Sequence, residues 1–157
     1  MRDAAKLVIA VAASQMAGVI GAVFTSSSVR TWYVDLSKPS FTPPGWIFGP
    51  VWTTLYTLMG IAAWLVWRAG LPRLAARLAL GLFVGQFALN AFWSLIFFGL
   101  RQPLYAFVEI IFLWAAIVAT TVLFFRISTL AGLLMIPYIL WVSFAAVLNL
   151  AIARLNP

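Results

Sequence analysis

Five long apolar runs occupy most of this chain of 157 residues. Each run is about 20 residues or longer, which is the length that a helix needs to cross the hydrocarbon of a bilayer. In lipid the backbone amides must find partners within their own segment, and an α-helix supplies those partners. The sequence therefore predicts an all-α integral membrane protein, a single domain over residues 1–157 with five transmembrane helices in one bundle. The predicted helices cover residues 4–24, 46–67, 74–99, 104–125 and 130–153.

The composition also excludes several classes of protein and of site. Charged residues make up 8% of the chain, whereas a soluble domain carries about 25%. Histidine and cysteine are absent and there are only three carboxylates, so we expect no metal site, no thiol nucleophile and no Ser-His-Asp triad. We also expect no bound cofactor. The ten basic residues stand singly near the ends of the apolar runs, which is typical of helices in a membrane and not of a nucleic-acid surface.

The first apolar run raises the question of a signal peptide, because it follows Arg2 and Lys6. The run is long for the apolar region of a signal peptide, so we expect a retained first helix. The basic residues on the side of the N-terminus are Arg2, Lys6, Arg68, Arg73, Arg77 and Arg126, against Arg30, Lys38, Arg101 and Arg154 on the other side. This excess favours a cytoplasmic N-terminus in a multi-pass protein of a bacterial cell membrane.

One substantial loop, residues 25–45, separates the first two runs. Its prolines forbid a continuous helix, and it carries Trp32, Tyr33 and Phe41, which a simple tether does not need. We therefore expect a folded lid over one end of the bundle. The residues assigned to this lid are Trp32, Lys38, Pro39, Pro43 and Pro44.

Polar and indole side chains gather in the half of the membrane beneath this loop. Helical spacing aligns them on one face of each of three predicted helices: Gln86, Asn90 and Trp93; Trp141, Ala145 and Asn149; and Trp52, Tyr56 and Met59. Polar groups are costly in lipid and should face the bundle interior. A cavity lined by indoles and amides is the prediction. The alternatives are tryptophans that only pack and amides that only link helices.

Two further features lie within the predicted helices. Glu109 is a carboxylate in a membrane span, which indicates a functional site unless it reaches the interface or pairs with Arg101. Gly81 and Gly85 form a GxxxG pattern on a face distinct from that of Gln86. Such small residues permit close helix contact, so a homodimer through the third helix is predicted, with internal packing as the alternative.

Motifs along the whole chain resemble those of the translocator protein family, which includes the tryptophan-rich sensory proteins and the peripheral benzodiazepine receptors. The matching motifs are Trp32-Tyr33, Lys38-Pro39, Pro43-Pro44, Trp52, Gly85-Gln86, Leu89-Asn90, Trp93, Phe97-Phe98-Gly99, Pro137-Tyr138, Trp141, Phe144-Ala145 and Leu148-Asn149. The resemblance implies a five-helix bundle, often dimeric, with a pocket for porphyrins, sterols and isoquinoline-type ligands. It places Tyr33, Trp52, Asn90, Trp141 and Ala145 around the ligand.

The resemblance has departures that bear on ligands and shape. Leu150 stands where the sterol-recognition stretch of animal members has a tyrosine, and Leu95 stands where many members have a proline. Sterol recognition through that stretch is therefore not expected here, and the shape of the third helix is expected to differ.

Together these features predict a membrane receptor that binds porphyrins, chiefly protoporphyrin IX, and is linked to tetrapyrrole handling or stress regulation. The ligand-binding set is Tyr33, Trp52, Gln86, Asn90, Trp93, Trp141, Ala145 and Asn149. One alternative is an enzyme that degrades protoporphyrin IX with light and oxygen through Trp52 and Trp141, as some bacterial relatives do. Another is a porphyrin or sterol transporter, although the internal repeats typical of transporters are not seen.

Overall fold

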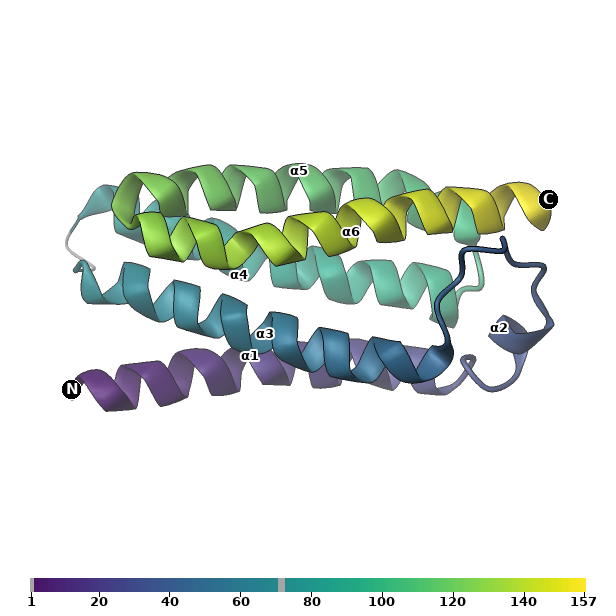
Figure 1. Cartoon of the computed structure of the whole chain (residues 1–157), viewed down its shortest axis with the longest axis horizontal. Coiled ribbons are helices and arrows are strands. Elements are labelled where there is room, and N and C mark those ends of the chain that lie inside the picture. Colours follow the sequence, from purple (N-terminus) through teal and green to yellow (C-terminus); the bar gives the residue numbers. More distant parts are fainter. Residues whose placement is uncertain (1, 71–72) are drawn as a thin grey trace.

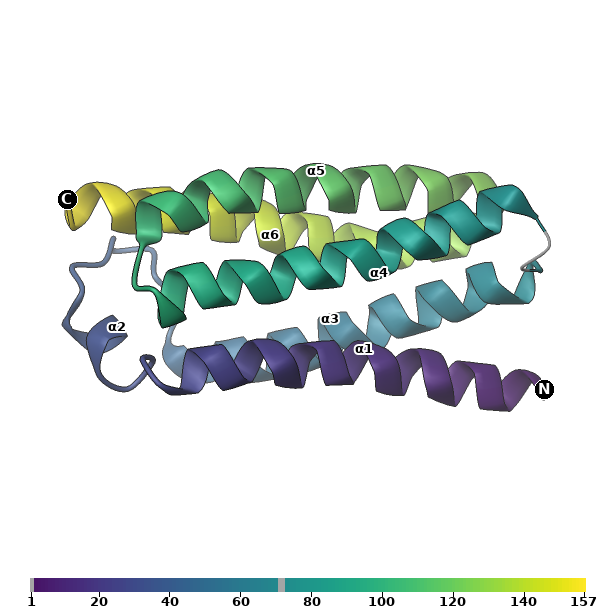
Figure 2. The same cartoon turned by 180° about the vertical axis from the view of Figure 1, so that it is seen from behind.

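The computed structural model describes residues 2–70 and 73–157, and its regular structure there is helical. The elements are α1 (Asp3–Ser26), α2 (Trp32–Asp35), α3 (Gly45–Arg68), α4 (Leu74–Ser94), the π-helix η1 (Leu95–Gly99), α5 (Pro103–Ile127) and α6 (Thr129–Leu155). The five long helices run side by side along the molecule, and the two termini lie at opposite ends (Figure 1, Figure 2).

Five helices in the described ranges are long and apolar enough to cross a membrane, with η1 extending α4 to Gly99. This confirms the predicted five-helix membrane fold, and each predicted run agrees with its helix to within two residues at both ends. The predicted lid is the segment between α1 and α3. It contains the short helix α2 and lies across one end of the bundle (Figure 1).

The pairing of α1 with α3 depends on a glycine. A Cβ atom built on Gly60 of α3 would lie 2.6 Å from the Cα of Val11 on α1, so only glycine permits this approach. Close backbone contact favours helix association in lipid, where apolar burial gives little drive. The side chain of Gln15 adds a polar link, because its Nε2 donates to the Thr57 hydroxyl (2.9 Å) and the Thr53 carbonyl (3.0 Å) on α3.

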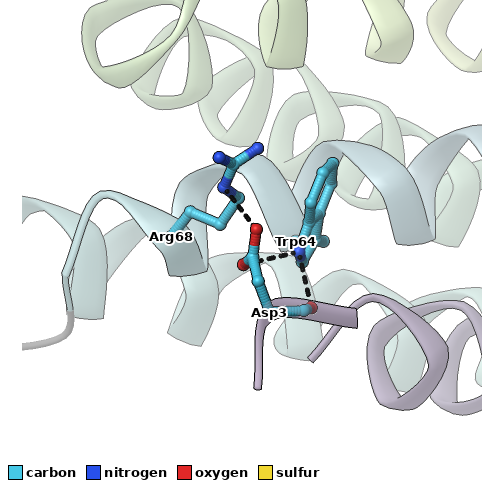
Figure 3. A network of polar contacts seen from close by, with 3 residues as sticks. All are labelled: Asp3, Trp64 and Arg68. Atoms are coloured by element: carbon cyan, nitrogen blue, oxygen red, sulfur yellow. Dashed lines mark hydrogen bonds and ion pairs between the residues drawn. The ribbon is translucent and has the colours of Figure 1, made fainter. Parts of the chain in front are cut away.

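A polar cluster joins the same two helices at the end opposite the lid (Figure 3). The Arg68 Nε lies 3.0 Å from an Asp3 carboxylate oxygen, and the indole N–H of Trp64 lies 3.2 Å from the other oxygen and from the Asp3 carbonyl. The Arg68 guanidinium also sits 4.6 Å from the centre of the Trp64 ring. Because both charged groups are half exposed, this cluster fixes the register of α1 on α3 and adds only about 0–1 kcal/mol of stability.

The lid is attached at its first end to the π-helix that finishes α4. In η1 the Leu100 N–H donates to the Leu95 carbonyl at 2.8 Å, five residues back. The Ser28 hydroxyl donates to the Phe98 carbonyl in the same segment at 2.7 Å. The Trp32 ring packs edge-on against Phe97, with 5.7 Å between ring centres. The segment from Leu95 to Gly99 is thus a π-helix that receives the lid.

The second attachment of the lid is a two-way pairing with the end of α6. The Ser37 N–H donates to Oδ1 of Asn156 at 3.0 Å, and Nδ2 of Asn156 donates back to the Ser37 carbonyl at 2.8 Å. The same Nδ2 also reaches the Ile152 carbonyl at 2.8 Å, which holds the amide in place. The Asn156 side chain therefore pairs with both the N–H and the carbonyl of Ser37 and so attaches the lid to the bundle.

Replacing Asn156 with Ala should free the Ser37 end of the lid without unfolding the bundle. A hydrogen bond contributes about 1 kcal/mol, so loss of the pairing should speed amide exchange at Ser37 by roughly fivefold or more. Hydrogen–deuterium exchange resolved to residues 36–42 measures this change. The α3 amides near Met59 serve as the internal control. Equal exchange rates at Ser37 in both proteins would show that the pairing with Asn156 does not stabilise the lid.

Candidate ligand-binding cavity

A cavity of about 710 Å³ lies beneath the lid, walled by α1, α3, α4 with η1, and α6. No residue of α5 lines it among those the structure describes. Its volume falls within the range of about 300–1,000 Å³ that small-molecule sites occupy. The predicted cavity under the lid is therefore present.

Aromatic rings form the wall of the cavity that α3 and α6 share. The Trp52 ring stacks on Tyr56 with 5.5 Å between centres and 27° between planes. The Trp141 ring stands at 88° to Trp52 with 6.4 Å between centres, and Phe48 meets Trp141 edge-on at 5.8 Å. All four rings line the cavity. The arrangement offers flat π faces in two nearly perpendicular directions, with Ala145 leaving space one turn beyond Trp141.

The amides of α4 belong to a chain of hydrogen bonds that runs from the cavity wall into the core. Nδ2 of Asn90 donates to the Tyr138 hydroxyl at 2.8 Å, and that hydroxyl donates to Oε1 of Gln86 at 2.8 Å. Asn90 lines the cavity, but Gln86 is fully buried behind the wall and does not. The position of Gln86 supports a role in holding Tyr138 and Asn90, and not in contacting a ligand.

A second polar pair closes the wall between α4 and α6. The indole N–H of Trp93 donates to Oδ1 of Asn149 at 2.9 Å, and Nδ2 of Asn149 donates to the Pro103 carbonyl at 2.7 Å. Both Trp93 and Asn149 line the cavity. Their polar atoms are satisfied within the protein, so they present the ligand with shape and apolar surface.

The lid contributes the roof of the cavity. Of the residues assigned to the lid, Lys38 and Pro43 line it together with Tyr33, whereas Trp32, Pro39 and Pro44 are not among its lining residues. Burial raises the pKa of the Tyr33 phenol above its usual range, so this ring meets the cavity as a neutral group.

Lys38 is the one charged side chain among the described residues that line the cavity. Its Nζ donates to the carbonyls of Val34 and Leu36, each at 3.1 Å, and lies 4.8 Å from the centre of the Tyr33 ring. An ammonium has three N–H donors, so one remains for an acceptor in the cavity. The site therefore combines apolar, aromatic walls with one positive group at the roof.

Glu109 takes no part in this cavity. It lies on α5 with 7% of its surface exposed, and neither carboxylate oxygen has a hydrogen-bond partner among the described residues. Of the two alternatives to a functional role, pairing with Arg101 is not seen among the described residues.

The contribution of α1 to the cavity was not predicted from the sequence. Gln15, Gly18 and Gly21 line it, as do Val19 and Ala22. Apart from Gln15, their side chains are small or apolar, so they resemble ordinary packing or lipid-facing residues. The spacing of Gln15, Gly18 and Gly21 by three residues, on a helix next to the lid, was the available signal.

Comparison with known proteins places the chain in one family. Residues 10–155 match the TspO/MBR family. The chain is 44% identical over 154 residues to tryptophan-rich protein TspO of Archaeoglobus fulgidus, covering 96% of this chain and 97% of that protein. It is 42% identical over 139 residues to the translocator protein of Homo sapiens, covering 87% and 82%. It is 40% identical over 141 residues to protein CrtK of Rhodobacter capsulatus, covering 90% and 86%. A match over nearly the whole length, on a five-helix membrane bundle with this cavity, means that the chain belongs to the TspO/MBR family.

Proposed function

We propose that this membrane protein binds flat, hydrophobic ligands that carry an acidic group, with porphyrins such as protoporphyrin IX as the leading class. The observation that carries the proposal is the composition of the cavity wall: stacked and perpendicular aromatic rings below, and at the roof Lys38, the one charged group among the described lining residues. Aromatic faces favour flat conjugated ligands, and an ammonium favours a carboxylate.

The satisfied polar groups of the wall support the same ligand class. Asn149 uses its amide on Trp93 and on the Pro103 carbonyl, and the Nδ2 of Asn90 is used on Tyr138. A ligand with many hydrogen-bonding groups would have to bury those groups without partners in such a site, and burying unpaired polar groups is costly. A ring system with its polar groups at one edge fits better. A relative from Cereibacter sphaeroides is named a tryptophan-rich sensory protein, which accords with a regulatory role for binding.

Replacing Lys38 with Met should weaken binding of protoporphyrin IX but not of its dimethyl ester. A hydrogen bond to a charged group contributes about 1.5–3 kcal/mol, so the free acid should lose roughly tenfold to a hundredfold in affinity. Fluorescence titration of the detergent-solubilised protein with both pigments measures the difference. Lys6→Met, at the other end of the bundle, is the matched control. Equal losses for acid and ester would contradict a carboxylate contact at Lys38.

A second candidate function is light- and oxygen-dependent breakdown of the bound porphyrin. The contact that favours it is the Trp52–Trp141 pair, whose rings meet at 6.4 Å with both exposed to the cavity. Two indoles in contact beside a photoexcited pigment are suited to electron transfer. Illumination of the purified protein with protoporphyrin IX separates the two functions, because turnover to a defined product indicates an enzyme and unaltered bound pigment indicates a receptor.

Replacing Trp141 with Phe should keep the fold and weaken porphyrin handling. A ring replaces a ring, so the loss of packing should be about 1–2 kcal/mol. Both the affinity for protoporphyrin IX and any photodegradation should fall. Trp114→Phe is the control, because Trp114 lies on α5 outside the cavity and bonds Ser143. Unchanged affinity and unchanged photodegradation in Trp141→Phe would remove this residue from the binding site.

We also propose that two copies associate through α4. A Cβ built on Gly81 or on Gly85 meets no atom of the described residues within 4 Å, and both glycines lie on the exposed surface with Leu78 and Ala88. This position is contrary to the alternative of packing inside the bundle. An exposed stripe of small residues permits close contact with a second helix, and a twofold pair is the simplest closed assembly.

Replacing both Gly81 and Gly85 with Ile should shift the detergent-solubilised protein from dimer to monomer. The bundle should stay folded because both positions open outward, and protoporphyrin IX binding should be largely kept. Analytical ultracentrifugation measures the assembly, with Val108→Ile on the exposed face of α5 as the control. A double variant that remains dimeric would place the interface on another surface.

A further inference from the structure

Gly18 on α1 meets the ring of Tyr56 on α3 without any intervening side chain. A Cβ built on Gly18 would lie 2.6 Å from Cε2 and 2.7 Å from Cδ2 of the tyrosine, which is closer than real Cβ atoms come to other atoms. Both residues line the cavity. The ring of Tyr56 thus lies against the backbone of α1, and any side chain at position 18 would have to displace it.

The tyrosine ring is held on its other sides by two aromatic neighbours. Trp52 stacks on it at 5.5 Å, and Phe87 of α4 meets it at 5.9 Å with 51° between the planes. Only 5% of Tyr56 is exposed. A ring pushed away from Gly18 can therefore move only by disturbing Trp52 or Phe87, or by entering the free space of the cavity.

Tyr56 also marks the deep end of the cavity. It is the residue furthest from the lid among those that α3 contributes, since the others run from Gly45 to Thr53. At 1.5 Å per residue, Tyr56 lies roughly 16 Å below the start of α3. The position of its ring therefore determines how deeply a flat ligand can enter the cavity.

We infer that Gly18 is a specificity-determining residue that sets the depth of the cavity by letting the Tyr56 ring lie against α1. A methyl group at position 18 drives the ring into the cavity and tilts the stacked Trp52. Wide ring systems are then excluded and narrow ones are still accepted. The selection of ligands by width rests on the proposed function. The position of the Tyr56 ring against α1 does not.

The test compares Gly18→Ala with a matched variant, Val23→Ile. Val23 lies on the same helix with 64% of its surface exposed and is not among the residues that line the cavity, so its substitution adds one carbon to α1 away from the site. The probes are protoporphyrin IX, pyrene-1-carboxylate and 1-naphthoate, titrated by tryptophan fluorescence. Gly18→Ala should lose roughly tenfold or more in affinity for the two wide probes and about twofold or less for naphthoate. Val23→Ile should bind all three as the parent protein does.

A second substitution tests the mechanism. In Gly18→Ala/Tyr56→Leu the smaller side chain leaves room for the added methyl group, so affinity for the wide probes should return toward that of Tyr56→Leu alone. Parent-like binding of the wide probes by Gly18→Ala would overturn the inference. An equal loss for all three probes, or no recovery in the double variant, would also overturn it.

A measurement without ligand keeps this inference separate from the proposed function. The near-ultraviolet circular dichroism of the stacked Trp52–Tyr56 pair should change in Gly18→Ala and stay constant in Val23→Ile. A parent protein that binds none of the probes would refute the proposed function, and the spectra would still show whether Gly18 determines the position of the Tyr56 ring. Identical spectra for the parent protein and Gly18→Ala would refute that role of Gly18.

Discussion

The interior of this bundle depends on one requirement of the membrane: polar side chains in the spanning helices need partners within the protein, because lipid offers none. Among the described residues, most buried amides and hydroxyls meet it, whereas Glu109 and Nε2 of Gln86 do not. Asn149 shows how the requirement organises the fold. Its amide accepts from Trp93 on α4 and donates to the carbonyl of Pro103, where α5 begins, so one α6 side chain joins three helices. Tyr138, also on α6, bonds both Asn90 and Gln86 deeper in the bundle and so ties α6 to α4. The pair α1 and α3 is brought together by close glycine contacts such as that of Gly60 with Val11.

The same requirement shapes the cavity. Once the amides are committed to other helices, the surface left for a ligand is largely aromatic and apolar, and its charge comes from Lys38 on the lid. The lid itself is held by hydrogen bonds at both ends, from Ser28 to η1 and from Ser37 to Asn156. For the ligands proposed above, selectivity would therefore follow from ring geometry and cavity depth more than from a pattern of hydrogen bonds. Tyr56 and Gly18 belong to this geometry as fully as the tryptophans do.

Hydropathy and helical spacing were sufficient to predict the five spans, the packed lid and the convergence of Trp52, Asn90 and Trp141, because those signals depend on one helix at a time. They failed for features that depend on two helices together. Gln86 shares a helix face with Asn90, yet the hydroxyl of Tyr138 draws it into the core. The share of α1 in the cavity was missed because glycine gives no chemical signal until its neighbour is known. The π-helix at Leu95 depends on a hydrogen-bond register that side-chain patterns do not encode.

The place of Lys38 has a consequence for how a ligand arrives. The lid lies at one end of the spanning helices (Figure 1), which is where a bilayer would meet water, and the aromatic residues of the cavity wall lie along the helices below it. An amphiphile dissolved in a bilayer already rests with its acid group at that boundary and its rings among the acyl chains. The bilayer therefore orients such a molecule, and fixes its depth and tilt in the membrane, before the molecule contacts the protein. The search for the site is then reduced to two dimensions, and little orientational entropy remains to be lost on binding.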